Sequence, residues 1–309
     1  MGSKDTSPTP PIPAAGRNVR GLWWHGFWLA ASITFTEFNT VLPSLVIDAG
    51  GREIHIGILT AIMVGVPLIA QLGFAGYLHG RPKKKPFLML GIHVRVGALA
   101  GAAVTVGIAR NTETSLVLGL LYLWMLLFSL SGAFAGISYT DITGKAVRRE
   151  DRRRFFVLKQ TLAGIGVLAA ALAGRAILAE LEYPTSYRMM FFAAAGSLFV
   201  ATAGFWVIRE PAASGAPSGA AAGEGSAGGA VRPSYREIMR SIPGILRGDR
   251  TLRTYIAASN LVGLSITLVP FYVALGRSRG VLTGEDVGTL LLVQIGAMVI
   301  SNVIWSAIA

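Results

Sequence analysis

The stretch SLVLGLLYLWMLLFSLSGAFAGISY, residues 115–139, contains no charged side chain. A helix needs about 20 apolar residues to cross the roughly 30 Å hydrocarbon core of a bilayer, and such a helix satisfies its own backbone polar groups. This stretch therefore predicts a transmembrane helix. Seven further apolar runs bring the prediction to eight spans in an all-α membrane protein, at about 21–47, 55–79, 87–109, 157–180, 188–208, 254–275 and 287–309.

The composition of the 309-residue chain supports this class of protein. Only 14% of the residues are charged, against roughly 25% in soluble proteins, and 52% are hydrophobic. The mean hydropathy is +0.56. This hydrophobic content excludes a disordered chain, and the absence of cysteine excludes a disulfide-stapled fold and cysteine metal sites.

The net charge of +12 comes from basic residues that gather between the apolar runs. The N-terminal segment and the connections 80–86, 140–156 and 209–253 together hold 20 Lys and Arg, whereas the other side holds 5. Because cytoplasmic loops carry the excess of Lys and Arg, this alternation predicts a multi-pass protein of the plasma (inner) membrane with a cytoplasmic N-terminus. Topology explains the positive charge, so we expect no nucleic-acid partner.

Two polar segments divide the chain. Residues 1–20 are rich in Pro, Ser and Thr, which predicts a disordered tail, and residues 211–231 consist mainly of Ala, Gly and Ser, which form flexible coils. Apolar residues at helical spacing then alternate with Arg from Tyr235 to Arg247, which predicts an amphipathic helix on the membrane surface or, alternatively, a helix packed under the bundle. The expected organisation is a cytoplasmic tail, a six-helix bundle, a cytoplasmic linker and the first two helices of a second bundle, over 1–20, 21–208, 209–253 and 254–309.

The two bundles resemble each other in sequence. The tripeptide AAS at 30–32, followed by Pro43, recurs at 257–259, followed by Pro270, with the same spacing from tripeptide to proline. Three positions of the next span recur with an offset of 231, namely Gly57, Leu59 and Gly65 as Gly288, Leu290 and Gly296. A parallel repeat about an axis normal to the membrane is a known transporter design.

The connection between the second and third spans, GYLHGRPKKKP at 76–86, resembles the signature loop of the major facilitator superfamily, Gly-x-Leu-x-Asp-Arg-x-Gly-Arg-Lys. Gly80 stands at the Asp position and Lys83 at the second Gly position. The positions that fit are Gly76, Leu78, Arg81, Lys84 and Lys85. Six spans, a long linker and further spans are also similar to the layout of that family. The resemblance implies a helical bundle that transports a small solute by secondary active transport and alternating access.

The same resemblance implies a gating role for Arg81, Lys84 and Lys85. Asp141, at the cytoplasmic end of the fourth span, would engage this basic loop as a gate, and an ordinary helix-end role is the alternative. Adding the offset of 231 to Arg81 leads to position 312, beyond the last residue. We therefore expect a chain truncated after its eighth span, which the missing C-terminal helices or a partner chain would complete.

Glu37 lies near the middle of the first span, where a carboxylate is costly and normally faces a cavity. On a helical wheel it shares one arc with the polar residues Ser32, Thr36, Asn39, Thr40 and Ser44. By the resemblance this arc lines the transport cavity, so Glu37, Asn39 and Thr40 are predicted to bind substrate or a proton. Transport would then be coupled to protons through Glu37. A structural hydrogen bond from Glu37 to a neighbouring helix is the alternative.

Arg95 in the third span and Asn260 in the seventh complete the predicted binding residues. Arg95 would pair with a carboxylate or bind an anionic substrate, unless its side chain extends to the cytoplasmic surface. Asn260 lies in a span that lines the cavity in the resembled family. A hydrogen bond that joins helices is the alternative for Asn260.

The sequence shows no catalytic or metal-binding pattern. Its histidines are not at metal-ligand spacing, and it has no HExxH motif, carboxylate cluster or nucleophile motif. We therefore expect no enzymatic activity, no metal and no resident cofactor, with the lipid bilayer and a small-molecule substrate as partners. The alternative to a carrier is a membrane module that does not transport or that acts only with a partner chain.

Overall fold

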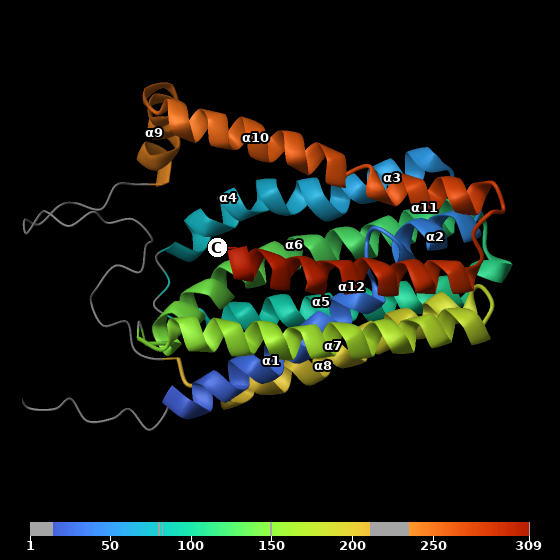
Figure 1. Ribbon diagram of the computed structural model, residues 1–309, viewed down its shortest axis with the longest axis horizontal. Coiled ribbons are helices and arrows are strands. Elements are labelled where there is room, and N and C mark those ends of the chain that lie inside the picture. The colour runs from blue at the N-terminus through green and yellow to red at the C-terminus, as the bar shows by residue number, and fades with distance from the viewer. Residues whose placement is uncertain (1–14, 80, 82, 149, 211–234, 309) are drawn as a thin grey trace, which may run out of the picture.

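The computed structural model describes residues 15–79, 81, 83–148, 150–210 and 235–308. Long helices run side by side along the molecule (Figure 1), and within these ranges every regular element is helical. In chain order they are α1 (Ala15–Phe35), α2 (Val41–Asp48), α3 (Glu53–Thr60), the π-helical η1 (Ala61–Gly65), α4 (Val66–His79), α5 (Lys85–Gly107), the 3-10 helix η2 (Ala109–Asn111), α6 (Thr114–Ala146), α7 (Arg152–Glu180), α8 (Thr185–Val207), α9 (Tyr235–Gly248), α10 (Arg250–Ile266), α11 (Val269–Ser278) and α12 (Gly284–Ile308).

Several of these helices have the length and composition of membrane spans. In the described part of the chain six segments meet both requirements: Glu53–Leu78, Lys85–Gly107, Thr114–Ala146, Arg152–Glu180, Thr185–Val207 and Arg250–Ser278. They confirm an all-α, multi-pass membrane protein. The last predicted span, 287–309, corresponds to α12, which packs along α7 (Figure 1).

The first predicted span, 21–47, is not one continuous helix. α1 ends at Phe35 and α2 begins at Val41, and residues 36–40 leave the helical conformation. Pro43 gives the physical reason, because it lacks the N–H that a continuous helix would bond to a carbonyl one turn earlier. Residues that the sequence placed in the middle of a helix therefore lie in an interruption.

The predicted span 254–275 is interrupted in the same way. α10 ends at Ile266 and α11 begins at Val269. Pro270 is the second residue of α11 and likewise has no N–H to continue the ladder of α10.

The helix boundaries repeat in step with the sequence. α2 begins two positions before Pro43, at Val41, and α11 begins one position before Pro270, at Val269. α3 begins at Glu53 and α12 at Gly284, and both starts precede the repeated glycines Gly57 and Gly288 by the same spacing. Helix starts and helix interruptions both recur, which supports an internal repeat.

The packed core lies among α1, α5, α6, α7 and α8. α5 packs on α6 and α8, and α1 packs on α7 and α8. α1 and α8 approach most closely at Gly21 and Gly204, where a Cβ on either glycine would lie 2.5 Å or less from the backbone oxygen of the other. Small residues permit this close approach of membrane helices, and only glycine fits here.

The helices after the linker differ in how they pack on the earlier ones; we call α1–α8 the first bundle and α10–α12 the second bundle. α11 packs on α2 and α3, and α12 packs on α7 and α2. α10 contacts chiefly α9, and each of residues 253–264 in α10 is exposed. The two bundles therefore meet through α11 and α12.

The tail predicted over 1–20 is helical from Ala15 onward, and the part before Ala15 lies outside the described residues. A tertiary contact explains the longer helix. The Asn18 side-chain amide donates to the backbone oxygen of Arg209 at 2.9 Å, and its Oδ1 accepts from the Arg209 N–H at 3.0 Å. These bonds attach the first turn of α1 to the end of α8.

The other predicted connections also differ from simple loops. The connection 140–156 is mostly helical, since α6 continues to Ala146 and α7 begins at Arg152. The helix predicted after the linker is present as α9. The low-complexity segment 211–231 lies outside the described residues.

Candidate functional site

Glu37 lies half-buried in the interruption between α1 and α2, and its carboxylate accepts five hydrogen bonds. Oε2 accepts from the backbone N–H groups of Asn39 and Thr40, both at 2.8 Å, and from the Thr40 hydroxyl at 3.0 Å. Oε1 accepts from the side-chain amide of Asn39 at 2.7 Å and from that of Gln294 in α12 at 3.3 Å. We call Glu37, Asn39, Thr40 and Gln294 the break cluster.

Glu37 lies shortly before a helix start, where the helix dipole favours negative charge. The first N–H groups of α2, those of Val41 and Leu42, bond to the Glu37 backbone oxygen at 3.1 and 3.2 Å. The Glu37 carboxylate binds the N–H groups of the two residues that precede α2. The donors around the Glu37 carboxylate are all neutral. In the described part of the chain Glu37 forms no ion pair.

A second polar group joins the far end of α2 to α11. Asp48 forms an ion pair with Arg277 and accepts a hydrogen bond from the Tyr187 hydroxyl in α8 at 2.7 Å. The Tyr187 hydroxyl also lies 2.7 Å from Ser44 Oγ, and Arg277 donates to the backbone oxygen of Leu282 at 2.7 Å. We call Asp48, Arg277, Tyr187 and Ser44 the end lock. It attaches the second bundle to the first.

Sequence reasoning did not find the end lock. Asp48 and Arg277 are 229 residues apart, and only the packing of α11 on α2 brings them together. One signal was available, because each charge comes directly after an apolar stretch on the same predicted side of the membrane.

The Asp48 charge also acts on a neighbouring tyrosine. Burial, and next the Asp48 charge, raise the pKa of Tyr183 in the connection between α7 and α8.

The predicted gating residues lie at the opposite end of the bundle. Lys84 Nζ lies 3.1 Å from Asp141, and Lys145 Nζ lies 2.6 Å from the same carboxylate. Glu210, which follows α8, accepts from the backbone N–H of Lys84 at 2.9 and 3.0 Å and from that of Lys85 at 2.9 Å. The structure brings Lys84 and Asp141 together and adds Glu210, which the sequence had not indicated.

The other two residues of the predicted gate contact the first bundle as well. Lys85 Nζ donates to the backbone oxygen of Ile208 at 2.7 Å. The Arg81 guanidinium lies 5.1 Å from the ring centroid of Tyr77 and 5.8 Å from that of Phe87. These contacts hold α4, α5 and α8 together and involve no residue of α10, α11 or α12.

Arg95 lies half-way along α5, on the face that packs into the bundle. Ile92 and Leu99 on that face are 2% and 0% exposed, whereas Arg95 is half-buried. The guanidinium carbon lies 4.1 Å from the ring centroid of Phe128. Within the described residues Arg95 takes part in no ion pair, and its Nε has no hydrogen-bond partner. A cation without a countercharge in this position is costly.

Asn260 lies exposed on α10, and its side-chain amide donates to the backbone oxygen of Ile256 at 2.8 Å. This bond stays within the helix. Of the predicted binding residues, the structure therefore gathers Glu37, Asn39 and Thr40 and leaves Arg95 and Asn260 apart from them.

Among the residues that the structure describes, no group of three or more His, Cys, Asp or Glu is arranged to hold a metal ion. Comparison of the chain with protein-family models, with curated proteins and with solved structures gives no match. The function is therefore inferred from the residues of this chain and their geometry.

Proposed function

We propose that the chain is a secondary transporter of the major facilitator type, which moves a small solute by alternating access between its two bundles. The observation that carries this proposal is the pair of helix interruptions at equivalent positions of the repeat. Irregular backbone at membrane depth is tolerated where protein buries it or where it lines a cavity, and discontinuous helices form the binding sites of many transporters.

The break cluster gives this carrier a route for proton coupling. A proton on Glu37 would remove its charge and occupy one acceptor position that now serves Asn39 and Thr40. The same carboxylate contacts Gln294 of the second bundle. Protonation would therefore weaken both the hydrogen bonds to the residues before α2 and the hydrogen bond from Gln294 between the bundles.

Arg95 supports a negatively charged substrate. Its guanidinium faces the interior of the first bundle and forms no ion pair among the described residues. An anionic solute would supply the missing countercharge.

The proposal is tested with the purified chain in liposomes. A mixture of anionic, neutral and cationic small solutes is supplied outside, with and without an imposed pH gradient, and the lumen is analysed by mass spectrometry. We expect gradient-dependent accumulation that Glu37→Gln abolishes. Asp286→Asn is the matched control, because the Asp286 carboxylate likewise accepts a hydrogen bond from a backbone N–H just before a helix, that of Thr283 at 2.7 Å before α12. Uptake by Glu37→Gln that still follows the gradient would contradict the role of Glu37.

A partner-dependent membrane module that does not transport by itself is the second candidate. The observation that favours it is α10, in which every residue from 253 to 264 is exposed. Apolar side chains there include Leu261, at 73% exposure, and Leu264, at 67%. Absence of flux, together with a partner chain that co-purifies and covers α10, would favour this function over the carrier.

A further inference from the structure

Two adjoining cavities open at the end of the bundle that carries the basic loops. The first has a volume of about 510 Å³ and lies between α1 and α8. The second has a volume of about 670 Å³ and lies where α1, α5 and α8 meet. Arg17 and Val207 line both cavities, so the two lie side by side, and we call them together the basic recess.

The basic recess lies at the level where membrane spans begin and end. Lys85, the first residue of one candidate span, and Val207, the last residue of another, both line it. Two tryptophans on its walls, Trp24 and Trp206, are 46% and 58% exposed. Tryptophan is enriched at the headgroup level of membranes. The recess is therefore placed for lipid headgroups, whichever side of the membrane it faces.

Positive charge dominates the walls of the recess. Arg17, Lys83, Lys85 and Arg209 line the second cavity with one acid, Glu210. The Glu210 carboxylate already accepts from backbone N–H groups at the start of α5 and lies 3.6 Å from Lys145 Nζ. The cationic side chains thus keep an excess of charge.

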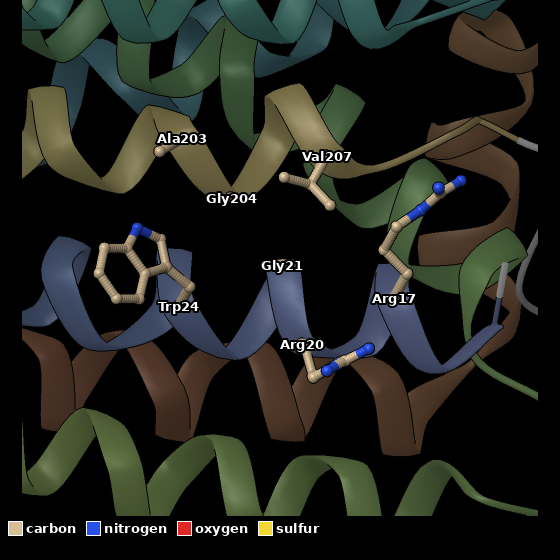
Figure 2. A pocket seen from close by; sticks show the side chains of 7 residues that line it. All are labelled: Arg17, Arg20, Gly21, Trp24, Ala203, Gly204 and Val207. Atoms are coloured by element: carbon tan, nitrogen blue, oxygen red, sulfur yellow. The ribbon is translucent and has the colours of Figure 1, made fainter.

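Arg17 is the residue best placed to contact a ligand. It is half-buried in the shared wall, and its Nε is covered without a hydrogen-bond partner. In Figure 2 the Arg17 and Arg20 side chains extend from α1 near the end of the bundle, and the Trp24 ring lies farther along α1, beside Ala203 of α8. The view shows Arg17 at the end of α1 nearest Val207 and the Trp24 ring between α1 and Ala203, whereas Arg20 extends from the side of α1 away from α8.

The walls of the recess are held in place by contacts within the chain. The Asn18 side chain exchanges two hydrogen bonds with the Arg209 backbone, and Trp24 Nε1 donates to the Val200 oxygen at 2.8 Å. The close contact of Gly21 with Gly204 fixes the distance between α1 and α8. A ligand would therefore enter a recess that is already formed.

We propose that the basic recess binds the phosphate headgroup of an anionic phospholipid, with Arg17 on the phosphate and Trp24 and Val207 beside the acyl chains. Basic pockets between membrane helices bind such headgroups, and the apolar wall suits an attached chain better than a free ion. The recess lies away from the break cluster, although Lys85 of the predicted gate lines it, and the binding of lipid there does not require the proposed transport.

The experiment measures the thermal stability of the purified full chain in detergent micelles that contain phosphatidylglycerol or phosphatidylcholine with the same acyl chains. We expect half-maximal stabilisation at a phosphatidylglycerol content at least about tenfold lower than the phosphatidylcholine content, because each Lys or Arg near anionic lipid strengthens binding severalfold. Arg17→Gln/Lys83→Gln should remove most of this preference. Arg153→Gln/Arg154→Gln removes the same charge from exposed positions outside the recess and should retain it.

Three results would overturn the proposal. They are equal stabilisation by both lipids, equal loss of preference in both double variants, and a stabilisation by free inorganic phosphate that matches that of phosphatidylglycerol. The last result would assign the recess to a soluble anion. If the first double variant is unstable in phosphatidylcholine, the exposed Arg209→Gln alone repeats the test and should weaken the preference severalfold.

Discussion

The interruption between α1 and α2 and the interruption between α10 and α11 occupy equivalent positions of the repeat, yet their surroundings differ. The first is buried, with Thr36 at 4% and Thr40 at 3% exposure, and contains the Glu37 carboxylate. The second contains no acidic residue, and the Thr267 hydroxyl donates to Gly263 of its own helix at 2.8 Å. Both interruptions lie just before a proline, whereas α9 continues through Pro243, and a carboxylate accompanies the first interruption alone. We propose that this carboxylate lets the first interruption respond to protons.

The largest effect is expected at the first interruption. Glu37→Gln should lower the free energy of unfolding by about 2–3 kcal/mol. Both carboxylate oxygens of Glu37 accept hydrogen bonds from N–H groups, and in glutamine one of these oxygens is replaced by an NH2 group that cannot accept them. Chemical denaturation in mixed micelles measures this change. A loss no larger than that of Thr267→Val would show that the two interruptions do not differ in the way described.

The next effect is expected at the end lock, which holds α11 against α2. Asp48→Asn should cost about 1–2 kcal/mol, less than for a fully buried pair because both side chains are partly exposed. Since the chain has no cysteine, Ala274→Cys, at a position with 0% exposure in α11, gives a single labelling site. Maleimide should label this site faster in the Asp48→Asn background. An unchanged labelling rate would mean that α11 is held by apolar packing alone.

Arg95 tests whether the charge inside the first bundle serves the fold or the function. Arg95→Gln should leave the free energy of unfolding unchanged or raise it by up to about 1 kcal/mol, because an unpaired cation is removed from the interior. Uptake of anionic solutes into liposomes should be lost in the same variant. A clear loss of stability with normal uptake would instead assign Arg95 to the fold.

The smallest effect is expected at the second interruption. Thr267→Val removes one hydroxyl that bonds within its own helix, so the free energy of unfolding should change by less than about 0.5 kcal/mol. Flux should keep its dependence on the pH gradient. An effect as large as that of Glu37→Gln would show that both interruptions carry function.

Hydropathy alone located the membrane segments, because a helix in lipid satisfies its backbone hydrogen bonds locally and needs only a long apolar run. The recurring AAS tripeptides, each followed by a proline, likewise indicated a repeat, and the recurring helix starts support it. The interruption within 21–47 was not predicted, because the mean hydropathy of a span does not depend on the single N–H that Pro43 lacks.

The sequence by itself determined the all-α membrane class and the position of most spans, and it placed Glu37 and Arg95 within apolar stretches. Only the tertiary structure decided what these residues contact. Gln294 meets Glu37 from 257 residues away, and Arg209 meets Asn18 from 191 residues away, because two helix faces pack together. Such contacts depend on how whole helices are placed, whereas a span depends on the solvent around one segment of the chain.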